Sequence, residues 1–376
     1  MSPFGAVARR EWRRFAATPR LWWLVLILPL LLPGLLVAIF AERAPQHLPV
    51  AVLDYDDSPL SREFHRALAA TPGLAAQRHV PDLALAGAAV RRGEVYAIIA
   101  IPPEFGRDIL RAGQPRVQLY FNRQTTTAGN IVLRDVRTAV GTLGVGIGLT
   151  QGVLPAVLME THPLYNPGLD FARFLALPLA VAVLHVLLVV IAIDVTGREL
   201  RESSAGEWLA AAGGRTVTAL LGKLLPYAAW FLLYGPVILW LLVRLLGLEV
   251  RGSPGLWLAG WAALIAACMG LGVFLVGVIG NLRMATSVAS VLISPAFAYS
   301  GMTFPAVAMA GFAAFWSFAL PLGHFLNLQA GQLALGAPAQ AALGHIGWLL
   351  LFALLPLTCA RRWRRLLREP AAWGRA

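Results

Sequence analysis

The chain has few of the residues on which catalytic and metal sites are built. Among its 376 residues there are two cysteines and one lysine. Cys268 and Cys359 both lie in apolar stretches, which argues against a disulfide framework or a thiolate metal site. No GxxxxGK[ST], HExxH, GxSxG or CxxC string occurs, so the chain has no P-loop for ATP hydrolysis and none of these hydrolase or metal signatures. We therefore expect no catalytic residue, metal ligand or cofactor in the chain itself.

Charged residues are also scarce. They make up 13% of the chain, whereas hydrophobic residues make up 58%, which is too apolar for a soluble protein of this length and indicates a polytopic membrane protein. The net charge of +12 does not indicate nucleic-acid binding, because the basic residues cluster beside apolar runs and no nucleic-acid-binding motif occurs. The expected surroundings are the lipid bilayer, with no nucleic-acid partner.

The positions of the charges predict how the chain crosses the membrane. Residues 1–20 contain five arginines and one glutamate, and the tail 361–376 contains six arginines and one glutamate. Residues 42–172 carry twelve arginines and twelve acids. Since basic segments beside apolar spans stay in the cytoplasm, we expect both termini to be cytoplasmic and residues 42–172 to be extracytoplasmic.

Apolar runs of about 20 residues, the length that crosses a bilayer as a helix, predict six spans within an α-helical polytopic fold. The last two come from residues 284–360, which contain no charged side chain. Between them, residues 304–325 predict a broken or re-entrant hairpin at the outer surface. The predicted spans are 21–41, 174–193, 224–243, 256–282, about 285–303 and about 343–360, the last five forming a bundle over 173–360.

Residues 42–172 predict an inserted α/β domain. Short β-rich runs alternate with helical segments, which indicates a small mixed or parallel sheet. Asp54, Asp56 and Asp57 follow the first strand, where a structural turn is favoured over a cation site. The predicted strands are 49–54, 75–79, 95–101 and 117–121, and the predicted helices are 59–70, 81–92, 104–112 and 126–150.

Two segments next to the spans are amphipathic or charged. Residues 4–15 place apolar side chains on one face and four arginines on the other, which predicts a helix at the inner membrane interface. In loop 195–222, acidic and basic residues from Arg198 to Glu207 predict a short charged helix. Charge alone leaves two readings open, a docking site for a cytoplasmic protein and a solvated loop that only sets topology.

The predicted spans contain no Asp, Glu, Lys or Arg, which argues against ion-coupled transport. His185 lies in the middle of the second span, where an ionisable residue is a candidate functional group. We favour a neutral imidazole that is hydrogen-bonded to a neighbouring helix.

Several strings, in their order and spacing, resemble the permease subunits of type-2 ABC exporters that have a large external domain after the first span. The resemblance covers nearly the whole chain. The strings are Arg10-Glu11-Trp12 with Thr18-Pro19-Arg20, Tyr165-Asn166-Pro167, Gly197-Arg198-Glu199 with Glu207, Gly222-Lys223-Leu224-Leu225-Pro226, Ser300-Gly301-Met302-Thr303-Phe304-Pro305, and Leu320-Pro321 with His324.

The resemblance implies a permease of the bacterial inner membrane that pairs with a second permease, identical or related. Two separate ABC ATPase subunits would hold ATP and Mg²⁺ and dock on the cytoplasmic loops, and a periplasmic adaptor could bind the external domain. The residues that the resemblance assigns are Arg198, Glu199, Glu202 and Glu207 for ATPase coupling, Arg10, Glu11 and Trp12 for the interfacial helix, and Gly301, Phe304 and Pro305 for the outer hairpin.

A row of small residues lies along one side of the fifth predicted span. Ser287, Ser290 and Ser294 recur at a spacing that allows close approach of another helix. We place them at the pathway between two permeases, and helix packing within one protomer is the alternative.

Two other functions compete with the permease. A membrane receptor with an external ligand-binding domain predicts a cytoplasmic effector region, whereas the tail from Arg361 is short. A membrane-embedded acyltransferase or hydrolase using His185 or His162 predicts an acid or nucleophile at the same depth, which only another span could supply.

Overall fold

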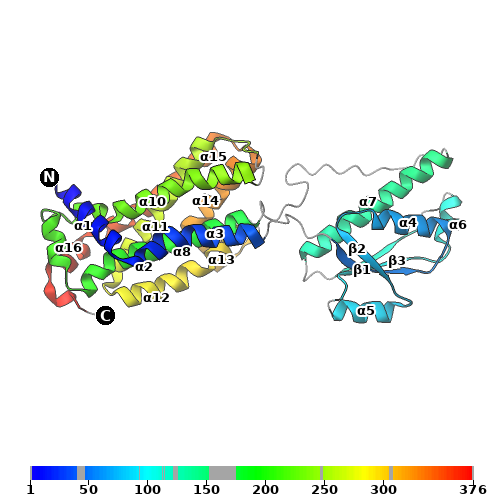
Figure 1. The fold of residues 1–376 in the computed structure, drawn as a ribbon, viewed down its shortest axis with the longest axis horizontal. Coiled ribbons are helices and arrows are strands. Elements are labelled where there is room, and N and C mark those ends of the chain that lie inside the picture. Colours follow the sequence, from blue (N-terminus) through cyan, green and yellow to red (C-terminus); the bar gives the residue numbers. More distant parts are fainter. Residues whose placement is uncertain are drawn as a thin grey trace. The chain divides into compact units, whose positions relative to one another are not determined.

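The computed structural model describes residues 2–39, 47–92, 94–111, 113, 115–121, 126–151, 175–245, 249–304 and 308–374. Contacts within the chain define two compact units. One consists of Met1–Arg43 together with Leu164–Ala376, and the other of Ala44–Pro163. The first is helical and the second is α/β (Figure 1). Tyr165, Asn166 and Pro167, and the candidate His162, lie outside the described residues.

The α/β unit contains a mixed four-stranded sheet in the order β2-β1-β3-β4. β1 pairs in parallel with β2 and β3, and β3 pairs antiparallel with β4. The sheet is of the predicted mixed kind, and its strands and helices agree with the predicted ones to within a few residues. The elements are β1 Leu48–Asp54, α4 Pro59–Ala69, β2 Leu74–His79, α5 Leu83–Arg91, β3 Ala97–Ile101, α6 Phe105–Leu110, β4 Gln118–Phe121 and α7 Thr126–Gln151.

Alternation along the central strands explains the layers of this unit. Ala51 and Leu53 of β1 face a core that α5 covers, while α4 and α7 lie on the opposite side of the sheet (Figure 1). At the end of β1, Asp54 Oδ1 accepts hydrogen bonds from the backbone N–H groups of Asp56 and Asp57, at 3.0 and 3.1 Å. The acidic trio is therefore a structural turn, and no three metal-ligating side chains cluster anywhere in the described part of the chain.

The helical unit is built from long helices joined by short turns. α2 continues through a π-helical stretch, Trp23–Ile27, into α3, and α12 continues into a 3₁₀ turn, Ser294–Phe297. The helices are α1 Pro3–Ala17, α2 Pro19–Trp22, α3 Leu28–Ile39, α8 Leu177–Arg201, α9 Ala205–Ala211, α10 Thr216–Leu245, α11 Pro254–Ile279, α12 Leu282–Ile293, α13 Gly311–Ala319, α14 Pro321–Gln329, α15 Ala339–Ala353 and α16 Ala360–Arg368.

Among the described residues, five helical segments are long and apolar enough to cross a membrane, one fewer than predicted. The predicted fifth span, 285–303, is not one long helix. Pro295 follows the last α-helical turn of α12, and proline lacks the N–H that would continue the ladder. The five segments are Pro19–Leu36, Leu177–Arg201, Thr216–Leu241, Pro254–Ile279 and Ala339–Arg368.

Loop 195–222 also differs from the prediction. Arg198 and Glu199 do not share a separate short helix with Glu207, because α8 continues through Arg201 without a break. Ser203, with a φ of 58°, then turns the chain into α9, which carries Glu207. The predicted hairpin 304–325 is represented by α13 and α14, which meet at Leu320 in extended backbone. Pro305 lies outside the described residues.

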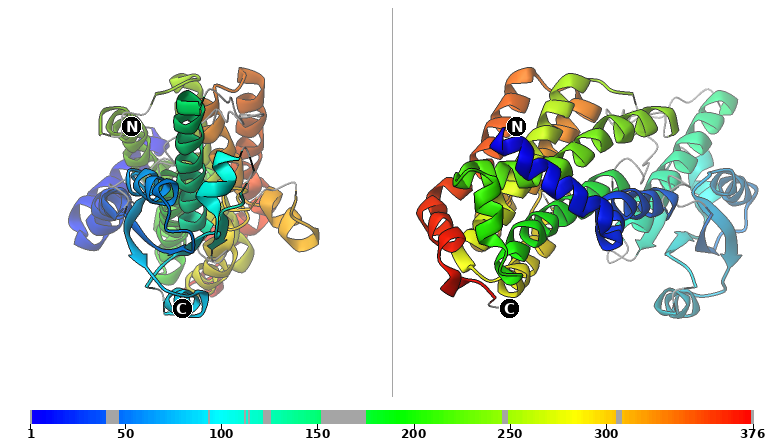
Figure 2. Two further views of the ribbon diagram at one scale, coloured as in Figure 1. Left: turned by 90° about the vertical axis from the view of Figure 1, so that its right-hand side faces the viewer. Right: turned by 60° about the vertical axis from the view of Figure 1, so that its left-hand side comes forward.

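Three helices gather at one end of the helical unit, which we call the basic end: α1, α9 and α16, residues 3–17, 205–211 and 360–368. α1 packs on α10, and α9 contacts both α1 and α16. Both marked ends of the chain lie there (Figures 1 and 2). The opposite end of this unit, which we call the far end, contains the start of α11 and the π-helical stretch Ala330–Leu335 that follows α14.

Candidate functional site

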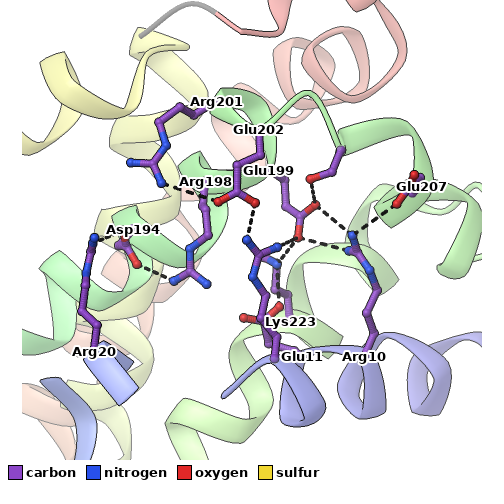
Figure 3. A network of polar contacts seen from close by, with 12 residues as sticks. Arg10, Glu11, Arg20, Asp194, Arg198, Glu199, Arg201, Glu202, Glu207 and Lys223 are labelled. Atoms are coloured by element: carbon purple, nitrogen blue, oxygen red, sulfur yellow. Dashed lines mark hydrogen bonds and ion pairs between the residues drawn. The ribbon is translucent and has the colours of Figure 1, made fainter. Parts of the chain in front are cut away.

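A buried cluster of charges joins three segments of the chain at the basic end. Lys223 of α10 is completely buried, and its Nζ lies 2.6 Å from Glu11 Oε2 of α1 and 2.6 Å from Glu199 Oε1 of α8. The side chains of Glu11 and Glu199 are 2% and 0% exposed. One ammonium group thus links α1, α8 and α10 (Figure 3).

The oxygens of both carboxylates in this cluster accept hydrogen bonds. Tyr227 donates its hydroxyl to Glu11 Oε1 at 2.7 Å. Arg10 donates to both oxygens of Glu199, at 3.1 and 3.2 Å, and the Ser204 hydroxyl donates to Glu199 Oε2. A buried ion pair is tolerated only when its remaining lone pairs are satisfied in this way. The ammonium and guanidinium groups balance the two carboxylates, so the cluster is neutral as a whole.

From this buried cluster, ion pairs lead outward to the surface of α9. Arg10 Nη2 lies 3.8 Å from Glu207 Oε2, and the side chain of Glu207 is 83% exposed. Arg14 bridges Glu199 and Glu202. Because exposed ion pairs contribute at most about 1 kcal/mol, these outer contacts orient α1 and α9 more than they stabilise them.

A second chain of ion pairs connects α2 to α8. Arg20 Nη2 lies 3.1 Å from Asp194 Oδ1, and the other carboxylate oxygen binds Arg198 four residues along the same helix. Arg198 is buried, whereas the side chain of Arg20 is 70% exposed. Figure 3 shows this group beside the Lys223 cluster. We call residues 19–39, which run from α2 into α3, the first crossing helix. Its first turn is tied to α8 through Arg20, and α1 is tied to α8 through Arg10.

Trp208 holds the buried side of α9 against the rest of the helical unit. Its indole N–H donates to the carbonyl oxygen of Ala219 at 3.1 Å, and Lys223 Nζ lies 5.1 Å from its ring centroid. Trp363 of α16 meets the same ring edge to face at 6.3 Å and donates to the carbonyl oxygen of Val273 at 3.1 Å. α9 is thus a surface helix whose buried side contacts the charge cluster through Trp208 and Lys223.

The segment after α16 crosses the end of α8 and the side of α9. Trp373 donates its indole N–H to the carbonyl oxygen of Leu366 at 2.8 Å, and the backbone N–H of Gly374 donates to the carbonyl oxygen of Leu200 at 2.8 Å. A Cβ on Gly206 of α9 would come within 2.9 Å of the Trp373 ring. We call residues 369–374 the C-terminal strap. The sequence predicted only a basic tail here.

The structure places the predicted coupling residues in two groups. Arg198 and Glu199 are buried inside the chain, where they are not exposed to a docking protein. Glu202 and Glu207 are exposed at the surface. Of the predicted interfacial residues, Arg10 and Glu11 belong to the buried network, whereas Trp12 is half exposed and stacks on Trp230 at 6.2 Å.

The predicted serine face and outer hairpin lie on exposed surfaces. Ser287, Ser290 and Ser294 are all exposed along one side of α12 and its 3₁₀ extension, while the opposite side packs on α8. Among the residues that the structure describes, packing within the protomer therefore leaves this face exposed. In the hairpin region Gly301 has a φ of 88°, which favours glycine, and Phe304 is half exposed.

The hydrogen bond predicted for His185 is not found. The side chain is fully buried in α8, yet neither ring nitrogen has a hydrogen-bond partner among the described residues. Hydrolase chemistry requires a base that is held by a neighbouring acid or nucleophile. His185 has no such contact in the part of the chain that the structure describes, so the structure does not support His185 as the base of an enzyme.

Comparison of the sequence with known proteins identifies the family of this chain. Residues 19–360 match the family described as ABC-2 family transporter protein. The inner membrane transport permease YhhJ of Escherichia coli (strain K12) is 25% identical over 298 residues, which cover 77% of this chain and 77% of that protein. The protein of the same description from Shigella flexneri matches to the same extent.

Proposed function

Because this chain belongs to the ABC-2 family of transporter proteins and is a multi-pass membrane permease, we propose that it is the membrane subunit of an ATP-driven exporter. In this proposal separate ATPase subunits dock on α9 at the basic end, and their closure moves α1, α8 and α10 together. The buried Lys223 cluster carries the proposal, because it is the point at which these three segments are joined beneath an exposed surface helix.

The residues take different roles in this mechanism than the sequence alone implied. Glu207 and Glu202 contact the ATPase, since they are exposed. Glu199 transmits the motion, because its carboxylate is buried between Lys223 and Arg10. Motion of α9 reaches α1 through the Arg10 guanidinium, which lies between the carboxylates of Glu199 and Glu207.

The proposal includes six passes and a cytoplasmic basic end, and the arrangement of the helices supports both. α8 ends and α10 begins at the Lys223 cluster, whereas α11 begins at the far end and its last turn lies against Trp363 of α16. Leu282 starts α12 beside Gly197 of α8, so α12 also leaves the basic end. Counting α3, and α15 together with α16, the proposal has six passes, which agrees with both termini lying at one end. The arginines on α1 and α16 support a cytoplasmic position for that end.

The serine face of α12 is the proposed contact with a second permease, identical or related. Ser287, Ser290 and Ser294 are exposed, and their hydroxyls are small enough for another helix backbone to approach closely. The hydroxyls of Ser287 and Ser290 already donate to carbonyl oxygens one turn earlier, so a partner can approach without leaving them unpaired.

The proposal is tested by purifying the full chain in mild detergent from the cells that express it and identifying what accompanies it. We expect a P-loop ATPase in one copy per permease, and we expect Glu207→Arg to reduce its recovery at least tenfold. Glu249→Arg is the matched control, because Glu249 is an exposed glutamate at the far end. A preparation without an ATPase, or equal recovery with both variants, would contradict the proposal.

A further inference from the structure

A cavity of about 560 Å³ opens at the basic end between the first crossing helix, α8 and α12. Its volume lies within the range of about 300–1,000 Å³ that is typical of ligand sites. Arg20 and Trp23 lie on one side and Arg283 on another, and Arg201 comes from the end of α8. The deeper wall is apolar and includes Leu24, Leu28 and Val190.

The cavity has an excess of positive charge at its mouth. Three arginines line it against one carboxylate, that of Asp194, which also pairs with Arg198 outside the lining. Arg201 Nη2 also lies 3.6 Å from Glu202 Oε1, which is outside the lining. Arg283 is exposed and has no ion-pair partner among the described residues. The side chain of Arg20 is 70% exposed although it reaches Asp194, so it can contact an added anion without leaving its partner.

This combination of charge and shape selects one class of ligand. An inorganic anion would use the arginines and leave the apolar wall unoccupied, and an apolar molecule would leave the arginines unpaired. An anionic phospholipid satisfies both, because its phosphate meets the arginines while an acyl chain lies along the leucines. Trp23, which is 57% exposed at the mouth, is of the residue type that sits at headgroup depth.

We propose that this cavity binds an anionic phospholipid of the surrounding membrane. The bound headgroup bridges Arg20, Arg201 and Arg283, and it thereby joins the first crossing helix to α8 and α12. Because Arg20 also holds Asp194, the lipid acts on one of the two ion-pair chains that connect α8 to the N-terminal helices. The proposal concerns binding by the single chain and does not depend on an ATPase partner.

The test is native mass spectrometry of the purified full chain with dioleoyl phosphatidylglycerol and dioleoyl phosphatidylcholine, which differ in headgroup charge. We expect tighter binding of phosphatidylglycerol. Arg283→Gln should weaken it about fivefold, the effect of one basic residue at a membrane surface, and leave phosphatidylcholine binding unchanged. Arg361→Gln is the matched control, because it removes an exposed arginine of α16 at the same end and should change binding less than twofold.

Two further experiments distinguish a lipid site from a site for free anions and from general attraction of anionic lipid to a basic surface. Thr286 lines the cavity and does not belong to the serine face, so Thr286→Trp should fill the space and weaken binding of both lipids without altering the charge. Inorganic phosphate at the same concentration should not displace the lipid. Equal effects of Arg283→Gln and Arg361→Gln would overturn the proposal in favour of surface attraction. Displacement by phosphate would overturn it in favour of a free-anion site.

Discussion

The two ends of the helical unit are held together by different kinds of contact. At the basic end, ion pairs with completely buried members join α1, α8 and α10. At the far end the corresponding contacts are neutral. Gln332 Oε1 accepts from the backbone N–H of Ser253 at 2.9 Å, and Trp257 donates to Gln329 Oε1 at 3.3 Å.

The difference between charged and neutral contacts indicates which end of the helical unit is stiff and which end can rearrange. A buried ion-pair cluster is stable only while every member stays paired, so we expect α1, α8 and α10 to move as one body. Neutral hydrogen bonds and ring contacts lose less when one of them slips. Phe318 and Trp348, 4.4 Å apart between ring centroids, can slide without leaving a charge unpaired. We therefore expect stiffness at the basic end and local rearrangement at the far end.

The largest effect should come from removing the ammonium group at the basic end. Lys223→Met places an apolar side chain between the buried carboxylates of Glu11 and Glu199 and leaves their charges uncompensated on that side. Removing one partner of a buried ion pair costs about 3–5 kcal/mol. We expect a loss of this size in the free energy of unfolding, measured by thermal or denaturant unfolding in detergent.

A double variant separates lost charge pairing from lost packing. Glu11→Gln together with Lys223→Met removes one of the two stranded charges, while Glu199 keeps its bonds to Arg10. The double variant should recover at least half of the stability lost by Lys223→Met alone. If it were no more stable than the single variant, the cluster would act through shape and the comparison between the two ends would fail.

The α/β unit could be predicted from the sequence because its signals are local. Each strand is a short β-rich run, and helices such as α4 begin with a capping residue, Ser58, followed by proline. Six membrane passes were also predicted from apolar length and charge, and they stay a prediction. Local pattern could not show that α12 is short, because the effect of Pro295 on a helix depends on what surrounds it.

The buried cluster could not be predicted in the same way. Glu11 and Lys223 lie 212 positions apart, and only the packing of α1 on α10 brings them together. One signal was present but was not used: Lys223 is the single lysine of a chain that otherwise uses arginine, at the start of an apolar run. Burial also reversed the interpretation of Glu199, because a charged residue in a loop between spans looks exposed until the helix is found to continue past it.

A smaller effect is expected from the equivalent change at the far end. Gln332→Leu removes the acceptor of the Ser253 N–H and the donor to the carbonyl oxygen of Ala337. Leaving such a buried neutral group unsatisfied costs about 1–3 kcal/mol. We expect a loss in that range by the same unfolding measurement. A loss as large as that of Lys223→Met would show that charge does not distinguish the two ends.

The smallest effect should come from changes in the C-terminal strap. They test whether the strap stabilises α9 in addition to the buried contacts of Trp208. Gly206→Ala places a methyl group within 2.9 Å of the Trp373 ring, and Trp373→Ala removes that ring. Each should destabilise α9 by no more than about 1 kcal/mol, which hydrogen exchange of the α9 amides would record as up to about fivefold faster exchange.

Because both changes break the same contact, the double variant should exchange no faster than the faster single variant. Ala210→Ser, at an exposed position of the same helix, should leave exchange unchanged, and additive effects of the first two changes would show that the strap does not hold α9.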